Sequence, residues 1–202
     1  WRQKTVVTGI LIYVISTVFI CFLTFRQVID IPTWNALFWI IMVFAAVNAV
    51  ARSFMQESRG VQLFYYTLLN PGAVILSKII YNTILLMLVA MVNFFFYSLF
   101  LGNQVSDTGM FLFGLLIGSA GLSATLTLVS AIASRANGNP SLMAILGFPI
   151  LIPLLMTIIR FSKNAIDGIG WAVNGNYALS MLALFGMVVV LSYLLFPYLW
   201  RD

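Results

Sequence analysis

The amino-acid sequence predicts an all-α integral membrane protein with a single transmembrane domain, residues 1–202, and three observations lead to this fold class. Of the 202 residues, 62% are hydrophobic and only 7% are charged, with a mean hydropathy of +1.07. In soluble domains about a quarter of the residues are charged. Six apolar runs each reach the roughly 20 residues that a helix needs to cross a bilayer. The Lys and Arg residues lie singly at the ends of these runs.

The six runs are the predicted spanning helices. A segment in lipid must satisfy its own backbone hydrogen bonds, so these runs are expected to be helical despite their many β-branched residues. The alternation of a membrane β-barrel strand is absent from them. The first run is too long, and too closely followed by the second, to be a cleaved signal peptide. The predicted spans are 6–25, 34–51, 80–101, 110–134, 142–161 and 177–200.

The basic residues predict the orientation. With six spans both termini lie on one side, and the positive-inside rule places the side richer in Lys and Arg in the cytoplasm. Three basic residues, Arg26, Arg160 and Lys163, fall on the other side. The cytoplasmic side collects Arg2, Lys4, Arg52, Arg59, Lys78, Arg135 and Arg201. At span ends, Trp34, Tyr177 and Trp200 are expected to be interfacial anchors.

Polar residues are few in the first three spans. Cys21 stands alone in the first span, which excludes an intrachain disulfide or a thiolate metal site. Asn48, Asn82 and Asn93 are predicted to hydrogen-bond between helices rather than to contact a substrate. The run Phe94 to Tyr97 points all round its helix, so packing and lipid contacts account for most of it.

The longest polar interruption, residues 52–78, is expected to lie on the cytoplasmic side between the second and third spans. Within it, Phe54 to Leu69 begins polar and ends apolar, as in a short helix lying in the membrane interface. Asn70, Pro71 and Gly72 then end that helix. The alternative is that Glu57 and Arg59 only keep this surface solvated.

The fourth and fifth spans carry backbone signals. Gly114, Gly118 and Gly121 permit close helix contact, and the first two have the GxxxG spacing. Packing inside the bundle is favoured for them over a dimer seam. Pro149 and Pro153 each remove a backbone hydrogen bond and so predict a kink in the fifth span. Whether this kink is a hinge that moves is left open. The connection after this span, 162–176, is expected to lie in the interface or to cap the bundle.

Several classes of function are excluded. The chain has no His, one Cys and five acidic residues that all fall near predicted loops or termini, which argues against an intramembrane enzyme or a proton-driven carrier. Without His, haem iron lacks its commonest ligand, so no cofactor is expected to bind directly. The basic residues form no patch for nucleic acid. No phosphate-binding GxxxxGK[ST] loop occurs, so an ATPase would be a separate polypeptide.

The segment FMQESRGVQLFYYTLLNPGAVILSK, residues 54–78, and the segment Arg135 to Leu155, which contains PSLMAILGFPILIPLL, resemble the CcmB family, the haem exporter protein B of cytochrome c maturation. The second segment is similar to the loop and the proline-bearing fifth span of that family. Here Phe54 to Gly60 is one residue shorter than the family pattern, and Gln62 and Phe64 replace more acidic neighbours. The other similarity, to the pattern F-x-x-D, G, L, LL and LAK, is carried by Phe54, Glu57, Gly60, Leu63, Leu68, Leu69 and Lys78.

The resemblance implies an ABC-2-like exporter permease, present in two copies at the bacterial inner membrane. It implies a separate ATPase subunit, CcmA, on which ATP is bound, and association with CcmC, CcmD and the haem chaperone CcmE. The permease would couple ATP hydrolysis to haem export or to release of haem-loaded CcmE. ATPase coupling would fall to Phe54, Glu57, Arg59, Gly60 and Gln62. The alternative is a permease of the same fold for a polysaccharide, lipid or drug.

Overall fold

The computed structural model describes the backbone of residues 2–25, 29–55, 70–135 and 140–201, and the side chains of 8–25, 29–50, 70–134 and 145–198. Six long apolar helices are found in these ranges, and each has the length and composition to span a membrane. The fold class predicted from the sequence is therefore confirmed. The helices are α1 (Arg2–Phe25), α2 (Ile31–Met55), α4 (Pro71–Leu101), α5 (Thr108–Arg135), α6 (Pro140–Ile166) and α7 (Trp171–Arg201).

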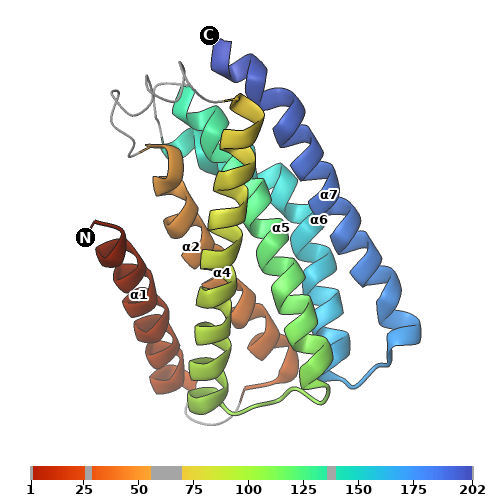
Figure 1. Ribbon diagram of the computed structural model, residues 1–202. Coiled ribbons are helices and arrows are strands. Elements are labelled where there is room, and N and C mark those ends of the chain that lie inside the picture. Colours follow the sequence, from red (N-terminus) through yellow and green to blue (C-terminus); the bar gives the residue numbers. More distant parts are fainter. Residues whose placement is uncertain (1, 26–28, 56–69, 136–139, 202) are drawn as a thin grey trace.

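The helices form a bundle around α5, as Figure 1 shows. Within its apolar window 78% of α5 is buried, against 22–56% for the other helices. Helix α5 packs against α2, α4, α6 and α7, whereas α1 lies at the edge on α4 and α2. The central place of α5 follows from its side chains, because Gly, Ala, Ser and Thr let its neighbours approach closely.

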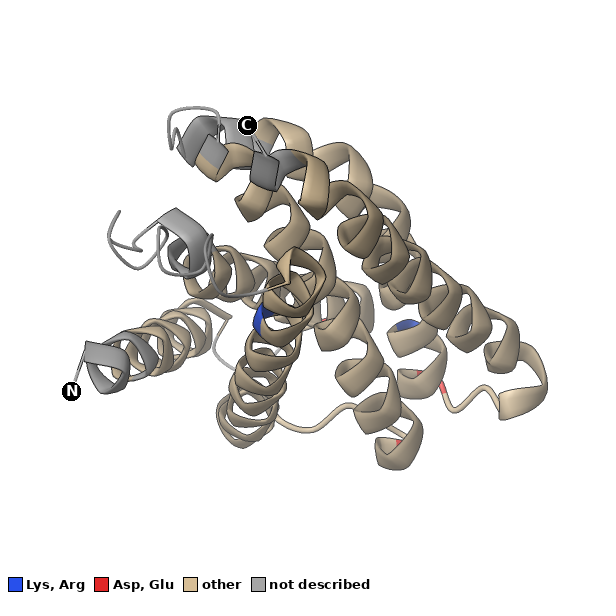
Figure 2. Cartoon of the chain, turned by 45° about the horizontal axis from the view of Figure 1, so that its top comes forward, with Lys and Arg blue, Asp and Glu red and all other residues tan. Residues whose placement is uncertain are grey.

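The two ends of the bundle differ in charge, and each is named here by its residues. The aspartate end is where α2 and α5 begin and α6 ends, next to Asp30, Asp107 and Asp167. The Lys78 end is where α2 ends and α4 begins. Charged residues are sparse along the described helices in Figure 2, as expected for surfaces that face lipid.

Helix α4 begins nine residues earlier than the predicted start at residue 80, at Pro71. The amide N–H of Gly72 donates to the Asn70 side chain at 3.0 Å, and Pro71 occupies the first helical position. Both are favourable start signals. Residues 71–78, expected outside the membrane, thus form the first two turns of α4. The charge of Lys78 predicts a span boundary, but a Lys near a span end can reach the interface through its long side chain and so can lie inside the helix.

The connection between α6 and α7 is also shorter than predicted. Helix α6 continues to Ile166 and α7 begins at Trp171, so residues 162–166 and 171–176 belong to these two helices and only 167–170 connect them. That the segment lies in the interface or caps the bundle stays a prediction. Gly168 turns the chain with a φ of +75°, a conformation that favours glycine. The N–H of Asp107 donates to the carbonyl of Ala165 at 3.0 Å, which ties this turn to the start of α5.

Trp34 does not anchor the protein in the interface as predicted, because its side chain is fully buried. Its ring lies at 4.8 Å from the ring of Tyr97 and 6.0 Å from that of Phe38, measured between centroids. The indole N–H donates to the carbonyl of Gly102 at 3.1 Å. An aromatic residue at a span end therefore joins the core here, because three helices meet around it.

Candidate functional site

Of the residues predicted to couple the chain to an ATPase, Phe54 belongs to a described helix, and that part of the helix lies at the Lys78 end. Phe54 is in the last turn of α2, in a part of the helix whose side chains are not described. Glu57, Arg59, Gly60 and Gln62 lie outside the described residues. Because α2 ends and α4 begins at the same end of the bundle (Figure 1), any force on the linking segment acts there.

The start of α4 is in close contact with α7. A Cβ atom at Gly72 would overlap the ring of Tyr193 on α7. The residues Val74, Ile75 and Ile79 then pack in one buried cluster with Leu128 of α5 and Val188 of α7. A displacement of the first turns of α4 would therefore act on both α5 and α7.

The three glycines of α5, here called the glycine seam (Gly114, Gly118 and Gly121), face α6. A Cβ at Gly114 would overlap the ring of Phe161. A Cβ at Gly118 would lie 3.0 Å from Trp39 of α2 and 3.3 Å from Ile158 of α6, and one at Gly121 would lie 2.9 Å from Leu154 of α6. The residue numbers of the α6 partners decrease as those of the α5 glycines increase. The glycine seam is therefore a contact line between two antiparallel helices within one chain.

The predicted prolines Pro149 and Pro153 both lie inside α6. Neither has an N–H, so the carbonyl groups four residues before them, at Ile145 and Pro149, have no helical partner. The Thr157 hydroxyl donates to the carbonyl of Pro153 at 2.8 Å. Two helical hydrogen bonds are consequently missing from α6 between residues 145 and 153.

A hydrogen-bonded group joins α2 to α6 in the aspartate half, and we call it the tryptophan lock (Asn35, Trp39 and Ser162). The indole N–H of Trp39 donates to the Ser162 hydroxyl at 2.9 Å, and this hydroxyl donates to Asn35 Oδ1 at 2.8 Å. The Asn35 amide donates to the carbonyl of Ile159 at 3.0 Å. All three side chains are buried, where satisfied polar networks specify one arrangement.

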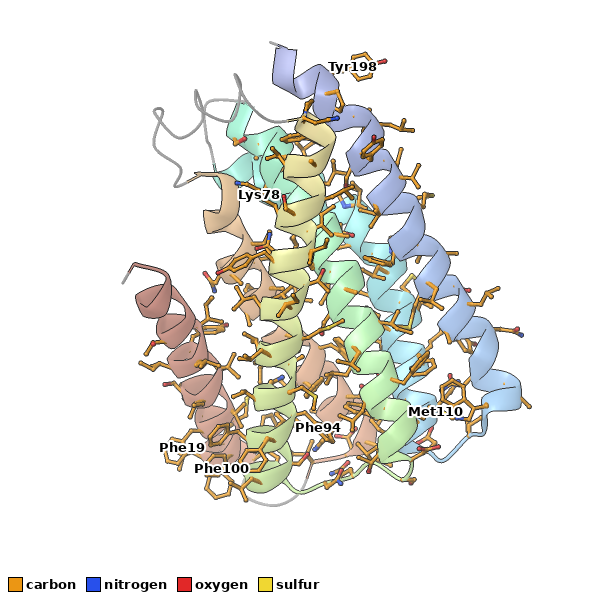
Figure 3. The ribbon with its side chains drawn as sticks, viewed as in Figure 1. Phe19, Lys78, Phe94, Phe100, Met110 and Tyr198 are labelled. Carbon is orange, nitrogen blue, oxygen red and sulfur yellow. The ribbon has the colours of Figure 1, made fainter. Side chains whose placement is uncertain are left out.

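The remaining cross-links of this half extend to α4, α5 and α7. The Tyr97 hydroxyl of α4 donates to the carbonyl of Trp34 at 2.9 Å. The side chain of Asn174 in α7 donates to the carbonyl of Phe161 at 3.1 Å. Rings contact as well, for example Phe94 with Phe111 at 5.1 Å and Phe19 with Phe100 at 5.9 Å between centroids; Figure 3 shows Phe19 and Phe100 together.

The intramembrane asparagines do not share one role. Asn82 donates to the Thr127 hydroxyl at 2.9 Å and joins α4 to α5 as predicted. The prediction is wrong for Asn48, whose amide donates to Phe44 of its own helix at 3.0 Å. Asn93 is fully buried, and neither its amide nitrogen nor its carbonyl oxygen has a hydrogen-bond partner.

The charged groups at the aspartate end cap helices. Asp107 accepts the N–H of Met110 at 2.9 Å at the start of α5. The pKa of Asp30 is lowered below its usual value by hydrogen bonds from Thr33, and the bond from the Thr33 side chain has the largest effect. Lys163 and Asp167 form an exposed ion pair at 3.0 Å, which adds little stability. Among the described residues no group of His, Cys, Asp and Glu could hold a metal ion.

The tryptophan lock was not predicted from the sequence. Asn35 and Ser162 lie beside predicted span boundaries, where polar residues are expected to meet water. A usable signal was Trp39 inside an apolar run, because a buried indole N–H needs an acceptor.

The comparisons with known proteins identify a family. A family model described as CcmB protein matches residues 6–198, which is nearly the whole chain. The match runs through all six described helices and through the segment between α2 and α4. The comparisons with curated proteins and with solved structures gave no match.

Proposed function

The chain belongs to the CcmB family, the membrane subunits of haem-exporter ABC transporters, and on this premise we propose how it works. It couples ATP hydrolysis by the separate ATPase subunit CcmA to haem export or to release of haem-loaded CcmE. The chain is a multi-pass membrane permease subunit that works with other components of the Ccm system. The observation that carries the proposal is the family match over residues 6–198.

The coupling site of this proposal is the segment 52–70, with Phe54, Glu57, Arg59, Gly60 and Gln62 as its contact residues. It is supported by what lies beside it. Helix α2 ends at Met55 and α4 begins at Pro71 at the same end of the bundle, and α4 packs against α5 and α7. A movement of a docked ATPase would thus reach the centre of the bundle through the first turns of α4.

The proposed assembly has two copies of this chain and two ATPase subunits, with CcmC, CcmD and CcmE as further partners. Its proposed location is the bacterial inner membrane, with both termini in the cytoplasm. The distribution of basic residues supports this orientation, because seven of the ten Lys and Arg residues fall on that side. On that side ATP is available to the partner subunit.

The docking experiment compares two double variants of equal charge change. Glu57→Ala with Arg59→Ala alters the proposed coupling site, and Lys163→Ala with Asp167→Ala removes an exposed pair at the opposite end. Each is co-expressed with CcmA and purified through a tag on this chain. We expect CcmA recovery to fall about tenfold, near 1.4 kcal/mol, for the first variant only. Equal recovery with both variants would refute the coupling role.

The cargo is tested with the complete set of partners. The tagged chain is purified with CcmA, CcmC, CcmD and haem-loaded CcmE, and release of CcmE is followed after adding ATP. We expect release that requires both ATP and this chain. A chain that binds an ATPase but neither CcmC nor CcmE would instead be a permease for another cargo, such as a polysaccharide, lipid or drug.

A further inference from the structure

An apolar pocket of about 220 Å³ lies between α5, α6 and α7. The proposed coupling to the ATPase assigns no role to this pocket. Its floor is Gly121 and Thr125 of α5. One wall is formed by α6, and the facing wall by α7. The wall residues are Pro149, Ile150, Pro153, Leu154, Leu184, Phe185, Met187 and Val188.

The backbone chemistry of the walls explains why the pocket stays open. Gly121 has no side chain to fill the floor, and Leu154 already lies so close that a Cβ at Gly121 would be 2.9 Å from it. Helix α6 therefore cannot move nearer to α5 at this level. Above that contact Pro149 and Pro153 interrupt the hydrogen bonds of α6, and a proline bends a helix.

The pocket lies near the middle of the membrane span. Gly121 is 13 residues from Thr108, at one end of α5, and 14 from Arg135, at the other, which is about 20 Å of helix on each side. The hydrocarbon core of a bilayer is about 30 Å thick, so the pocket opens into hydrocarbon rather than water. Its rim residues Ile150 and Met187 are exposed by 38% and 55%.

The size and chemistry of the pocket select its occupant. An apolar space excludes water, and an empty one forfeits dispersion contacts along its walls. Its volume is below the roughly 300 Å³ at which sites for whole small molecules begin, so it suits a piece of a flexible chain. At mid-membrane depth the ends of lipid acyl chains are present at high concentration. We propose that the pocket binds the terminal part of a phospholipid acyl chain.

The test uses the full-length chain in vesicles that contain a phospholipid with a diazirine near the end of one acyl chain. After illumination, mass spectrometry locates the labelled residues. The filling variant is Val188→Phe, which places a ring in the pocket. The control is Val190→Phe, two residues along α7, where Val190 is 57% exposed and does not line the pocket.

We expect labels to concentrate on residues 149–154 and 184–188 and to fall about fivefold in Val188→Phe but not in Val190→Phe, as for a filled cavity. Leu184→Phe, which fills the pocket from another position, is expected to repeat the loss. Equal labelling in the filled and control variants would overturn the proposal. So would labelling no denser than on the exposed face of α1 around Ile12, or pocket residues that cross-link to a second copy of the chain.

Discussion

The two halves of the bundle differ in how α6 and α7 are held against the other helices. In the aspartate half, buried side chains form hydrogen bonds across helices, and aromatic rings of α2, α4 and α5 pack edge to face. In the Lys78 half, cross-helix hydrogen bonds of the described side chains, such as Asn82 to Thr127 and Ser130 to the carbonyl of Val50, join α5 to α4 and α2. Helix α7 is held there by a buried cluster that consists mainly of Val, Ile, Leu and Ala. Two prolines interrupt α6 there, close to the lipid-facing pocket.

This contrast indicates which part of the molecule can change shape. Hydrogen bonds and ring pairs depend on direction, so a sliding helix breaks them. Aliphatic contacts are non-directional and survive a small slide. Packed helices slide by small shear motions when domains move. We therefore expect ATP-driven changes to remain in the Lys78 half, while the aspartate half moves as one body.

The largest expected effect is the loss of the tryptophan lock. Trp39→Ala removes a buried ring that lies against Gly118 and the hydrogen bond to Ser162, so we expect unfolding to become easier by about 3–5 kcal/mol. Thermal unfolding of the purified protein in detergent measures this. Trp39→Phe keeps most of the ring and should lose less. A change below about 1 kcal/mol for Trp39→Ala would show that the aspartate half is not held by this group.

The glycine seam gives the next effect. Gly114→Ala introduces a Cβ that overlaps the ring of Phe161, and overpacking of this kind destabilises by about 1–3 kcal/mol. Gly175→Ala in α7 is the matched control, because nothing lies within 4 Å of its added Cβ. The same unfolding measurement applies. If both variants behave alike, the seam does not set the distance between α5 and α6.

Replacing each of two asparagines of α4 by Leu should change the stability of the fold in opposite directions. Asn93→Leu removes a buried amide without partners, and we expect it to stabilise the fold by about 1–2 kcal/mol. Asn82→Leu removes the bond to Thr127 and should destabilise it by about 0.6 kcal/mol, typical of membrane hydrogen bonds. Destabilisation by both variants would show that Asn93 has a partner in the folded protein.

The smallest effect is a pH dependence at the start of α2. Hydrogen bonds from Thr33 lower the pKa of Asp30 from its ordinary value of 3.8. A carboxylate with a lowered folded-state pKa stabilises the fold above its ordinary pKa, and this contribution is lost as the pH falls through the folded-state pKa. Carbon NMR of labelled aspartate measures the titration. Thr33→Val removes the hydroxyl and should raise the Asp30 pKa, whereas an unchanged pKa would exclude this cause.

The sequence was sufficient for the number and type of the described helices, because each apolar run is long enough to demand a helix in lipid. Helix ends were harder to predict. Lys78 and the polar residues near Asn174 are typical of loops by residue type, yet Lys78 lies in α4 and Asn174 donates a hydrogen bond to α6 inside the bundle. A polar residue at a span end can face water or a neighbouring helix, and composition does not distinguish the two.

In the candidate site, the glycines and prolines that shape the backbone could be identified from the sequence, but the residues that they contact could not. Gly114 and Pro149 stand out by residue type alone, whereas the contact of Gly114 with Phe161 depends on how α5 and α6 align. Alignment between distant segments arises from packing of the whole bundle. The roles of Glu57 and Arg59 in docking stay predictions.

The most direct test measures distances between spin labels at both ends of the same two helices. On a Cys21→Ser background, one pair joins Leu99 of α4 to Lys163 of α6 at the aspartate end, and the other joins Ile80 to Ile145 at the Lys78 end. Distances are recorded with the ATPase subunit present, before and after adding ATP. We expect the Ile80 to Ile145 distance to change by more than about 2 Å, beyond a small interface shift, while the Leu99 to Lys163 distance stays constant. A change of equal size at both ends would contradict the division of the bundle into a fixed and an adjustable half.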